Sequence, residues 1–486
     1  MSHTLYEFTA EAITPMYLSG NDMRRFDLRA PSLRGGLRYW FRAMMGDVLQ
    51  GDWIKVHRLE GLVFGDTHRA SPVRVMLSET GNSRNFRQWQ NEPVPPGRDR
   101  KESFGVKYLG FSLYRQGKTT REGVKPGYPF RIALGFDRND QVLHDVVIGS
   151  LWLLAHYGGI GSRSRRGFGS FAVKPAAVTV MGIRETTTAR IPYAFSLPGA
   201  QRTALSSYFE DTIAAIKARF CAFAAKHMVD LPASSSMIDD QNLPKFPCFM
   251  AWQSVVVRPR NGAWNTWVEA MDAAGYFFRA FRAGRVAGNA NGSIREQSQD
   301  SLADAVTACT PDYTQVVNRY MPDWSQERRR WERTFDPKQK WQLRNPIFGL
   351  PLQYRSTHRP FPGKNMTASV RWRDGENTGD GNGNDRRSSP LFIRVLKLPD
   401  NTYGILMIAL YSQFVPDRAM IRLGPPQVSR ENRNACDFLK GIGSQPIQLA
   451  GYRVMDEFFA AARAHFAVHG EWGAGRMPLS HAEGGR

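Results

Sequence analysis

A glycine-rich segment in the first half of the chain carries the residue types needed to bind an anion. This glycine-arginine loop, Gly158 to Phe171, reads GGIGSRSRRGFGSF, so five of its fourteen residues are glycine and three are arginine. Glycines at this density permit positive φ angles, which lets consecutive backbone N–H groups converge on an anion. Guanidinium groups suit phosphate oxygens, and an aromatic ring suits a base. The expected ligand contacts are Gly161, Ser162, Arg163, Arg165, Arg166 and Phe168.

The loop matches neither of the common nucleotide-binding patterns. The Walker pattern requires Gly-Lys-Ser/Thr, and the dinucleotide pattern requires a strand before its glycines. The loop contains no lysine and follows an apolar stretch with helical spacing, Val142 to Tyr157. A long connection whose arginines simply face water is the alternative to a binding loop.

A second group of arginines lies on a predicted helix from Leu33 to about Leu49. Its apolar residues fall on one face at 3.6 residues per turn, and Arg34, Arg38 and Arg42 follow beside that face at four-residue steps. The amino-terminal end of a helix favours an anion near Arg34. With Arg29 in the preceding basic loop, these arginines are expected to contact the same ligand, and a solvated helix face is the alternative.

The composition is typical of a soluble globular protein, and its charge predicts a polyanionic partner. The chain has 486 residues, is 42% hydrophobic, and carries a formal charge of +21 with a pI near 10.0. This charge favours a polyanion, although a protein that is basic for solubility alone is the alternative. No apolar run approaches the ~18 residues of a membrane span, and the N-terminus lacks a secretory signal. We therefore expect a cytoplasmic protein without membrane attachment.

The cysteines support neither a disulfide framework nor a zinc site. They lack C-x-x-C spacing and a companion histidine cluster, so we expect a reducing compartment and no metal or other cofactor. The four are Cys221, Cys248, Cys309 and Cys436.

The predicted elements of the first part of the chain follow the order of a ferredoxin-like domain. That order is βαββαβ, here with an inserted hairpin, and the domain is expected to span residues 1–182. The predicted helices are 33–49 and 142–157, and the predicted strands are 4–13, 62–64, 73–77, 106–114, 130–136 and 171–181.

A second domain of the same type is expected over residues 248–470. Tyr276 to Arg282, YFFRAFR, is similar to Tyr39 to Met45, YWFRAMM, and both segments are expected on a helix that follows a strand. A helical linker region at 183–247 precedes this domain, and a loose tail at 471–486 follows it. The fold class is therefore α+β, with large insertions at 284–344 and 374–384.

Several sequence blocks resemble one known family. Residues 13–20, ITPMYLSG, and 28–40, LRAPSLRGGLRYW, resemble the N-terminal signature of the first subunit of the Cmr complex, the type III-B CRISPR effector. The glycine-arginine loop is similar to the glycine-rich loop of this RAMP-superfamily family. Residues 348–351, FGLP, and 386–391, RRSSPL, resemble its C-terminal blocks.

The resemblance implies two tandem ferredoxin-like (RRM-like, RAMP) domains in a non-catalytic RNA-binding subunit of antiviral defence. Such a subunit joins the end of the effector filament that carries the 3′ end of the guide RNA. The implied partners are the CRISPR guide RNA, the target RNA and the other Cmr complex subunits, and an obligate homo-oligomer is not expected. Arg386 and Arg387 are expected to add RNA contacts. No catalytic residue or metal is implied, because target cutting belongs to other subunits.

Two rival functions stay open. A RAMP-type endoribonuclease shares the fold and the glycine-rich loop but generally needs a positioned general acid or base, for which the first helix offers no histidine. A second chemistry for such an enzyme is metal-assisted cleavage through Asp22 and Asp27. The other rival function is that of a protein-protein adaptor. The histidines nearest to the first helix and the loop are His57, His68, His144 and His156.

Overall fold

A computed structural model describes the chain as two compact units. The first unit comprises Met1–Tyr276, Leu391–Ser412 and Phe466–Arg486, and the second comprises Phe277–Pro390 and Gln413–His465. The described residues are 4–81, 83–97, 103–185, 189–199, 202–232, 238, 243–282, 341–343, 345–349, 352–355, 365–372, 387–415, 419–423, 445–449 and 452–474.

The first unit contains a five-stranded antiparallel sheet in the order β2-β7-β1-β8-β9. Along the chain, α1 (Ala30–Val48) follows β1 and α4 (Gln141–Tyr157) precedes β8, so the first four strands and two helices follow the expected βαββαβ order. The strands are β1 (Thr4–Ala12), β2 (Val73–Glu79), β7 (Pro129–Phe136), β8 (Phe171–Val180) and β9 (Ile183–Glu185).

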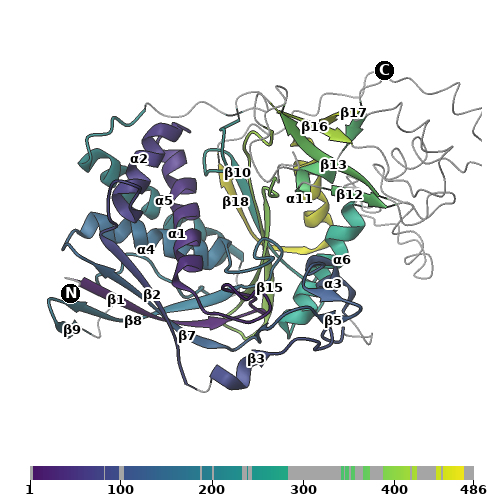
Figure 1. The fold of residues 1–486 in the computed structure, drawn as a ribbon, viewed down its shortest axis with the longest axis horizontal. Coiled ribbons are helices and arrows are strands. Elements are labelled where there is room, and N and C mark those ends of the chain that lie inside the picture. Colours follow the sequence, from purple (N-terminus) through teal and green to yellow (C-terminus); the bar gives the residue numbers. More distant parts are fainter. Residues whose placement is uncertain are drawn as a thin grey trace, which may run out of the picture. The chain divides into compact units, whose positions relative to one another are not determined.

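One face of this sheet is covered by helices. Alternate residues of β1, among them Tyr6 and Phe8, are fully buried, whereas the residues between them are partly or fully exposed. Helices α1, α2 (Trp53–Phe64), α4 and α5 (Arg202–Lys226) gather on one side of the sheet (Figure 1).

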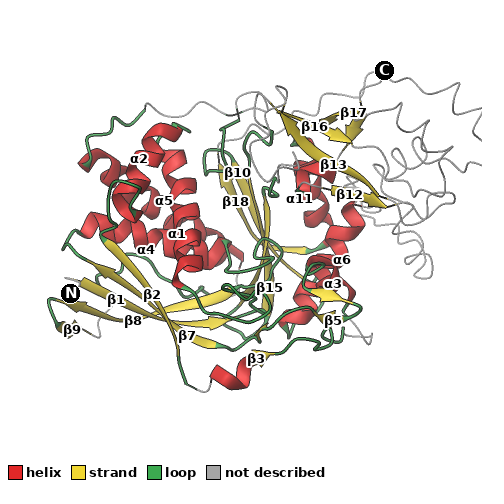
Figure 2. Cartoon of the chain, in the orientation of Figure 1, coloured by secondary structure: helices red, strands yellow, loops and turns green. Residues whose placement is uncertain are grey.

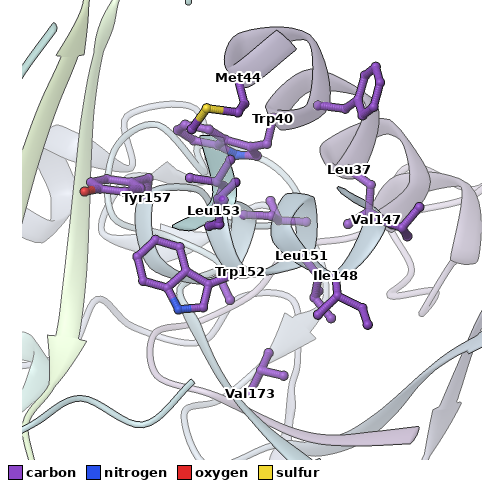
Figure 3. Packing of buried hydrophobic residues seen from close by; sticks show 14 of the residues in the cluster. Leu37, Trp40, Met44, Val147, Ile148, Leu151, Trp152, Leu153, Tyr157 and Val173 are labelled. Carbon is purple, nitrogen blue, oxygen red and sulfur yellow. The ribbon is translucent and has the colours of Figure 1, made fainter. Parts of the chain in front are cut away.

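The helices meet in an aromatic core. The whole apolar face predicted for the first helix is buried, which confirms its helical spacing. Trp40 of α1 lies 5.9 Å from Tyr157 of α4 between ring centroids, and Tyr157 lies 6.2 Å from Trp152 in the same cluster (Figure 3). Trp40 also lies 6.1 Å from Phe249 and 5.4 Å from Phe392, which belong to segments more than 200 residues further along the chain.

A second sheet of the first unit repeats the strand order of the first sheet. Its order is β14-β15-β10-β18, all antiparallel, so both sheets place their strands in the sequence second, third, first, fourth. In the chain α6 (Trp267–Arg282) follows the first of these strands and α11 (Arg453–His465) precedes the last. The strands are β10 (Trp252–Arg258), β14 (Leu391–Lys397), β15 (Tyr403–Leu410) and β18 (Ala467–Ala474).

The second unit contains its own sheet, in the order β11-β17-β16-β13-β12, drawn in yellow in Figure 2. Strands β11 and β17 pair in parallel and the other neighbours pair antiparallel. In the chain, the strands of this sheet fall between α6 and β14 and between β15 and α11. The strands are β11 (Trp341–Leu343), β12 (Leu352–Arg355), β13 (Asn365–Trp372), β16 (Ala419–Leu423) and β17 (Gln445–Leu449).

Several short elements complete the described chain. All but one lie between β2 and β7, where the sequence predicts a strand at 106–114. They are η1 (Ser83–Phe86), β3 (Arg87–Gln88), α3 (Phe104–Leu109), β4 (Tyr114–Arg115), β5 (Lys118–Thr119), β6 (Gly123–Val124) and η3 (Asn345–Phe348).

Two strand predictions in the first domain are wrong. Residues 62–64 form the last turn of α2, and residues 106–114 contain most of α3, a turn and the start of β4. A short apolar run has no periodicity long enough to separate a strand from a buried helix turn.

Among the described residues, no helix combines the length and hydropathy of a membrane-spanning segment.

The compact units also cut across the domain boundaries expected from the sequence. Residues 183–185 extend the first sheet as β9, and α5 packs on α1 and α4 of the same unit, so these parts of 183–247 are not a separate linker. Residues 471–474, expected to be loose, pair with β10 as part of β18. The expected insertions at 284–344 and 374–384 lie outside the described residues except for 341–343.

The Trp40 contacts give a direct stability prediction. Trp40→Ala should lower the free energy of unfolding by about 3–5 kcal/mol, because it removes a buried ring and leaves a cavity that the surrounding helices cannot fill. Ile54→Ala, on α2 and 81% exposed, is the matched control and should change it by less than about 0.5 kcal/mol. Denaturant titration of both variants measures this difference, and equal values would contradict the assigned core.

Candidate nucleic-acid interface

The glycine-arginine loop connects α4 to β8, and a buried arginine of β14 holds its ends together. Arg394 is only 1% exposed. Its guanidinium donates to the carbonyl oxygen of Gly158 and, at 2.5 Å, to that of Phe171. These are the first and last residues of the loop, so a single side chain closes it. Burial lowers the pKa of Arg394 to about 9, which leaves the group protonated at neutral pH.

Backbone amides of the loop donate to carbonyl oxygens of the protein. The Ile160 amide donates to Gly169 at 3.0 Å, the Ser162 amide to Tyr17 at 2.9 Å, and the Gly169 amide to Pro15 at 2.9 Å. An amide that already donates cannot hold an anion, so the predicted backbone cradle is wrong at these positions. At these positions, a contact of the loop to an anion has to come from a side chain.

Two loop glycines are required by close backbone packing. Gly161 has a φ of 96°, and a Cβ there would collide with the carbonyl oxygen of Tyr17. Gly169 has a φ of 65°, and a Cβ there would collide with the carbonyl oxygen of Ile160. Gly161 therefore lets the loop approach the segment that follows β1, and Gly169 lets the two halves of the loop pack on each other.

Arg163 stands in a backbone conformation that favours glycine. Its φ is 62°, which costs an L-residue about 1–2 kcal/mol. Its Nε donates to Ser112 Oγ at 2.9 Å, and it forms no ion pair with a carboxylate of the described residues. Partial burial lowers its pKa without removing the charge. The loop thus carries an oriented, half-buried cation.

The other two loop arginines are oriented by the second sheet. The Arg165 guanidinium carbon lies 4.4 Å from the ring centroid of Phe392 and 5.2 Å from that of Tyr39. Arg166 donates from Nη1 to the carbonyl oxygen of Leu391 at 3.2 Å. Both side chains are half-buried, so they present only part of each guanidinium to solvent.

Phe168 cannot stack on a base in this structure. Its side chain is fully buried and packs against the rings of Tyr17 at 6.1 Å and Tyr114 at 6.2 Å between centroids. The prediction that it offers a free ring face is therefore wrong. Flanking glycines do not expose an aromatic side chain when the loop folds back on its own domain.

The arginine stripe of α1 is largely engaged within the protein. Arg38 and Arg42 each approach Oε1 of Glu60 to 2.6 Å, and Glu60, on α2, is 1% exposed. Arg34 donates to the carbonyl oxygen of Phe64 at the end of α2. Partial burial and the neighbouring Arg38 lower the Arg34 pKa. These residues pack α1 against α2, so they are poor candidates for phosphate contacts.

The predicted contacts Arg29, Arg386 and Arg387 show no bond to the loop among the described residues. Arg29 donates to the carbonyl oxygen of Ser19 at 3.2 Å and lies 3.7 Å from Asp27. Arg387 is half-buried in the second unit, and Arg386 lies outside the described residues.

A basic hairpin next to the loop was missed from the sequence. Strands β4 and β5 pair around Gln116 and Gly117, both at positive φ, and they carry the exposed Arg115 and Lys118. Arg121 follows and donates to Ser162 Oγ of the loop at 3.4 Å. The signal was the charge of residues 104–125, which hold five basic residues and one acidic residue.

Two of the four histidines considered for acid-base chemistry are buried in the core. His144 and His156 are buried, and burial lowers the pKa of both, that of His156 to about 3. His57 lies on α2, distant from the loop in the sequence, and stacks on Trp53. His68 is exposed.

The carboxylates considered for metal-assisted cleavage are paired with arginines. Asp22 lies 3.6 Å from Arg25, and Asp27 lies 3.7 Å from Arg29. Within the described ranges, no group of three or more histidine, cysteine, aspartate or glutamate side chains is placed to hold a metal ion.

Comparison with known proteins connects this region to one superfamily. Residues 9–172 match the model of the RAMP superfamily. From Pyrococcus furiosus, the CRISPR system Cmr subunit Cmr1-1 is 31% identical over 180 residues, 36% of this chain and 49% of that protein. The subunit Cmr1-2 of the same organism is 28% identical over 185 residues, 35% of this chain and 96% of that protein. The match thus spans about half the length of the first relative.

The fold extends the likeness beyond the aligned sequence. The crystal structure of Cmr1 from Pyrococcus furiosus in its apo form superimposes with a TM-score of 0.50 and 16% identity, covering 96% of this chain and 99% of that chain. At this identity the likeness concerns the fold alone.

The closure of the loop by Arg394 can be tested directly. Arg394→Met should raise the hydrogen-exchange rates of amides in residues 158–171, because the Gly158 and Phe171 carbonyls lose their buried donor. Arg258→Met is the matched control, since Arg258 lies on β10 of the same sheet and pairs with Asp400 at 3.5 Å. Wild-type exchange of the loop in Arg394→Met would disprove this closure.

Proposed function

We propose an RNA-binding function for this chain, which belongs to the RAMP superfamily and is related to Cmr1 subunits of the Cmr CRISPR system. In this proposal the chain is a non-catalytic, cytoplasmic subunit of a type III-B effector complex. It holds the 3′ region of the guide RNA, or the guide-target duplex there, by the phosphate backbone.

The observation that carries the proposal is Arg163. Its backbone strain is stabilised by the packed loop, and such strain in a native structure points to a functional demand at that residue. Its guanidinium is oriented by Ser112 and is not neutralised by a described carboxylate. An oriented cation of this kind suits a phosphate oxygen.

The surrounding charge supports a polyanionic ligand. The loop arginines adjoin the basic hairpin through the bond from Arg121 to Ser162, and the whole chain carries a formal charge of +21. Contacts to phosphates fix the position of an RNA without reading its sequence. The proposal therefore predicts salt-dependent and sequence-tolerant binding.

The topology supports two tandem ferredoxin-like RAMP domains. Both sheets of the first unit have the strand order second, third, first, fourth, and each succession has one helix after its first strand and one before its last. In this interpretation the second domain contains the third sheet as an insertion. The glycine-arginine loop then belongs to the first domain, and its closing residue Arg394 to the second.

Removal of the loop cations should weaken RNA binding. The triple variant Arg163→Ala, Arg165→Ala, Arg166→Ala should lose about tenfold or more in affinity, and the slope of log K against log salt should shrink by about 2 for three lost phosphate contacts. Titration of labelled RNA at several salt concentrations measures both quantities.

The matched control removes three exposed arginines that pair with carboxylates elsewhere on the first sheet and in the segment that follows it. These are Arg74, Arg184 and Arg190. The control triple should keep nearly the wild-type slope. Equal effects of the two triple variants would mean that RNA binding depends only on the net charge of the chain. A separate crosslinking experiment on the assembled complex tests the adaptor interpretation, which an absence of RNA crosslinks to this chain would favour.

The non-catalytic role predicts no cleavage by the isolated chain. End-labelled guide and target RNA incubated with the purified protein, with and without Mg²⁺, should stay intact, because the two histidines nearest to the loop in the sequence, His144 and His156, are buried away from solvent. Site-specific cleavage that disappears in one defined variant would establish the endoribonuclease instead.

A further inference from the structure

Phe111 is an exposed aromatic side chain beside the loop. It is 76% exposed and makes no ring contact among the described residues. It follows Gly110 at the end of α3, and the next residue, Ser112, accepts the hydrogen bond from Arg163 Nε at 2.9 Å. Phe111 is therefore the sequence neighbour of Ser112, the residue that holds the Arg163 guanidinium.

The backbone that carries Phe111 is held firmly. The Gly110 amide donates to Val106 at 2.9 Å, and the Leu113 amide donates to Gly110 at 2.6 Å. Leu113 is fully buried. A Cβ on Gly110 would lie 2.7 Å from the Phe168 ring, so the buried Phe168 supports the turn from which Phe111 projects. An aromatic side chain on a fixed loop is a good platform for a ligand.

We propose that Phe111 stacks on an unpaired base of the RNA whose phosphates contact Arg163, so that this surface binds single-stranded RNA in preference to a duplex. The inference rests on the proposed RNA-binding function and specifies the form of RNA. Proteins that bind single strands combine a positive surface along the backbone with aromatic rings that stack the bases.

The charges around Phe111 fit this arrangement. Exposed Arg115 and Lys118 follow it on the β4-β5 hairpin, and Arg121 reaches the loop at Ser162. Glu122 is the one acidic residue between positions 104 and 125 of the sequence. A nucleotide stacked on Phe111 would therefore bind to a segment whose charge is mainly positive.

A duplex would not use the ring. Bases within a helix are already stacked on their neighbours, and double-stranded RNA presents mainly phosphates and 2′-hydroxyls to a protein. Phe111 would then contribute nothing specific, and the affinity for a duplex would depend on the arginines alone. This difference separates the stacking role from the phosphate contacts.

Phe111→Ala tests the inference on the full-length chain. Its affinity for a single-stranded oligonucleotide should fall about tenfold, while the salt slope and the affinity for a duplex of the same sequence stay at wild-type values. Phe111→Trp should restore single-strand binding. Ile183→Ala is the matched control, since Ile183 is a 70% exposed apolar residue of β9, and it should bind both RNAs like the wild type. Fluorescence anisotropy of labelled RNA measures each affinity.

Wild-type single-strand affinity in Phe111→Ala, or an equal loss for single strand and duplex, would overturn the inference. Either result would leave the dependence on Arg163, Arg165 and Arg166 intact if the proposed function holds. If that function fails, the loop triple variant binds RNA like its control triple, so the two failures are distinguishable.

Discussion

The fold of the candidate interface depends on one buried guanidinium. Arg394 sits in the apolar strand β14 and donates to the carbonyl oxygens at the two ends of the glycine-arginine loop. A loop with five glycines has a large conformational entropy to lose, and a planar fork that binds both ends restricts it effectively. Because the partners are carbonyls, the guanidinium is hydrogen-bonded without being neutralised, although burial lowers its pKa.

The basic residues fall into two groups. Arg38 and Arg42 pair with the buried Glu60, and Arg394 closes the loop, so their main role is to hold elements together. Arg163, Arg115 and Lys118 keep charge that the described protein does not neutralise. The same residue type thus builds the scaffold and supplies the surface, and only its neighbours distinguish the two uses.

The two sheets of the first unit share one strand order. Their first four strands are placed second, third, first, fourth, and the strands of the third sheet lie in the connections between α6 and β14 and between β15 and α11. The connection between β2 and β7 is extended as well, and it supplies the basic hairpin and Phe111.

The sequence by itself determined the helices around Trp40 and Tyr157 and most central strands, because apolar periodicity is a local property that burial then satisfies. It also indicated the loop and the family. Only the tertiary structure decided which aromatic side chains are exposed: Phe168 of the loop is buried by Tyr17 and Tyr114, whereas Phe111, in the connection between β2 and β7, is exposed. Arg394 lies 223 residues from Phe171, and no local pattern connects partners so far apart. Burial and pairing depend on contacts between distant segments, and those contacts exist only once the sheets have assembled.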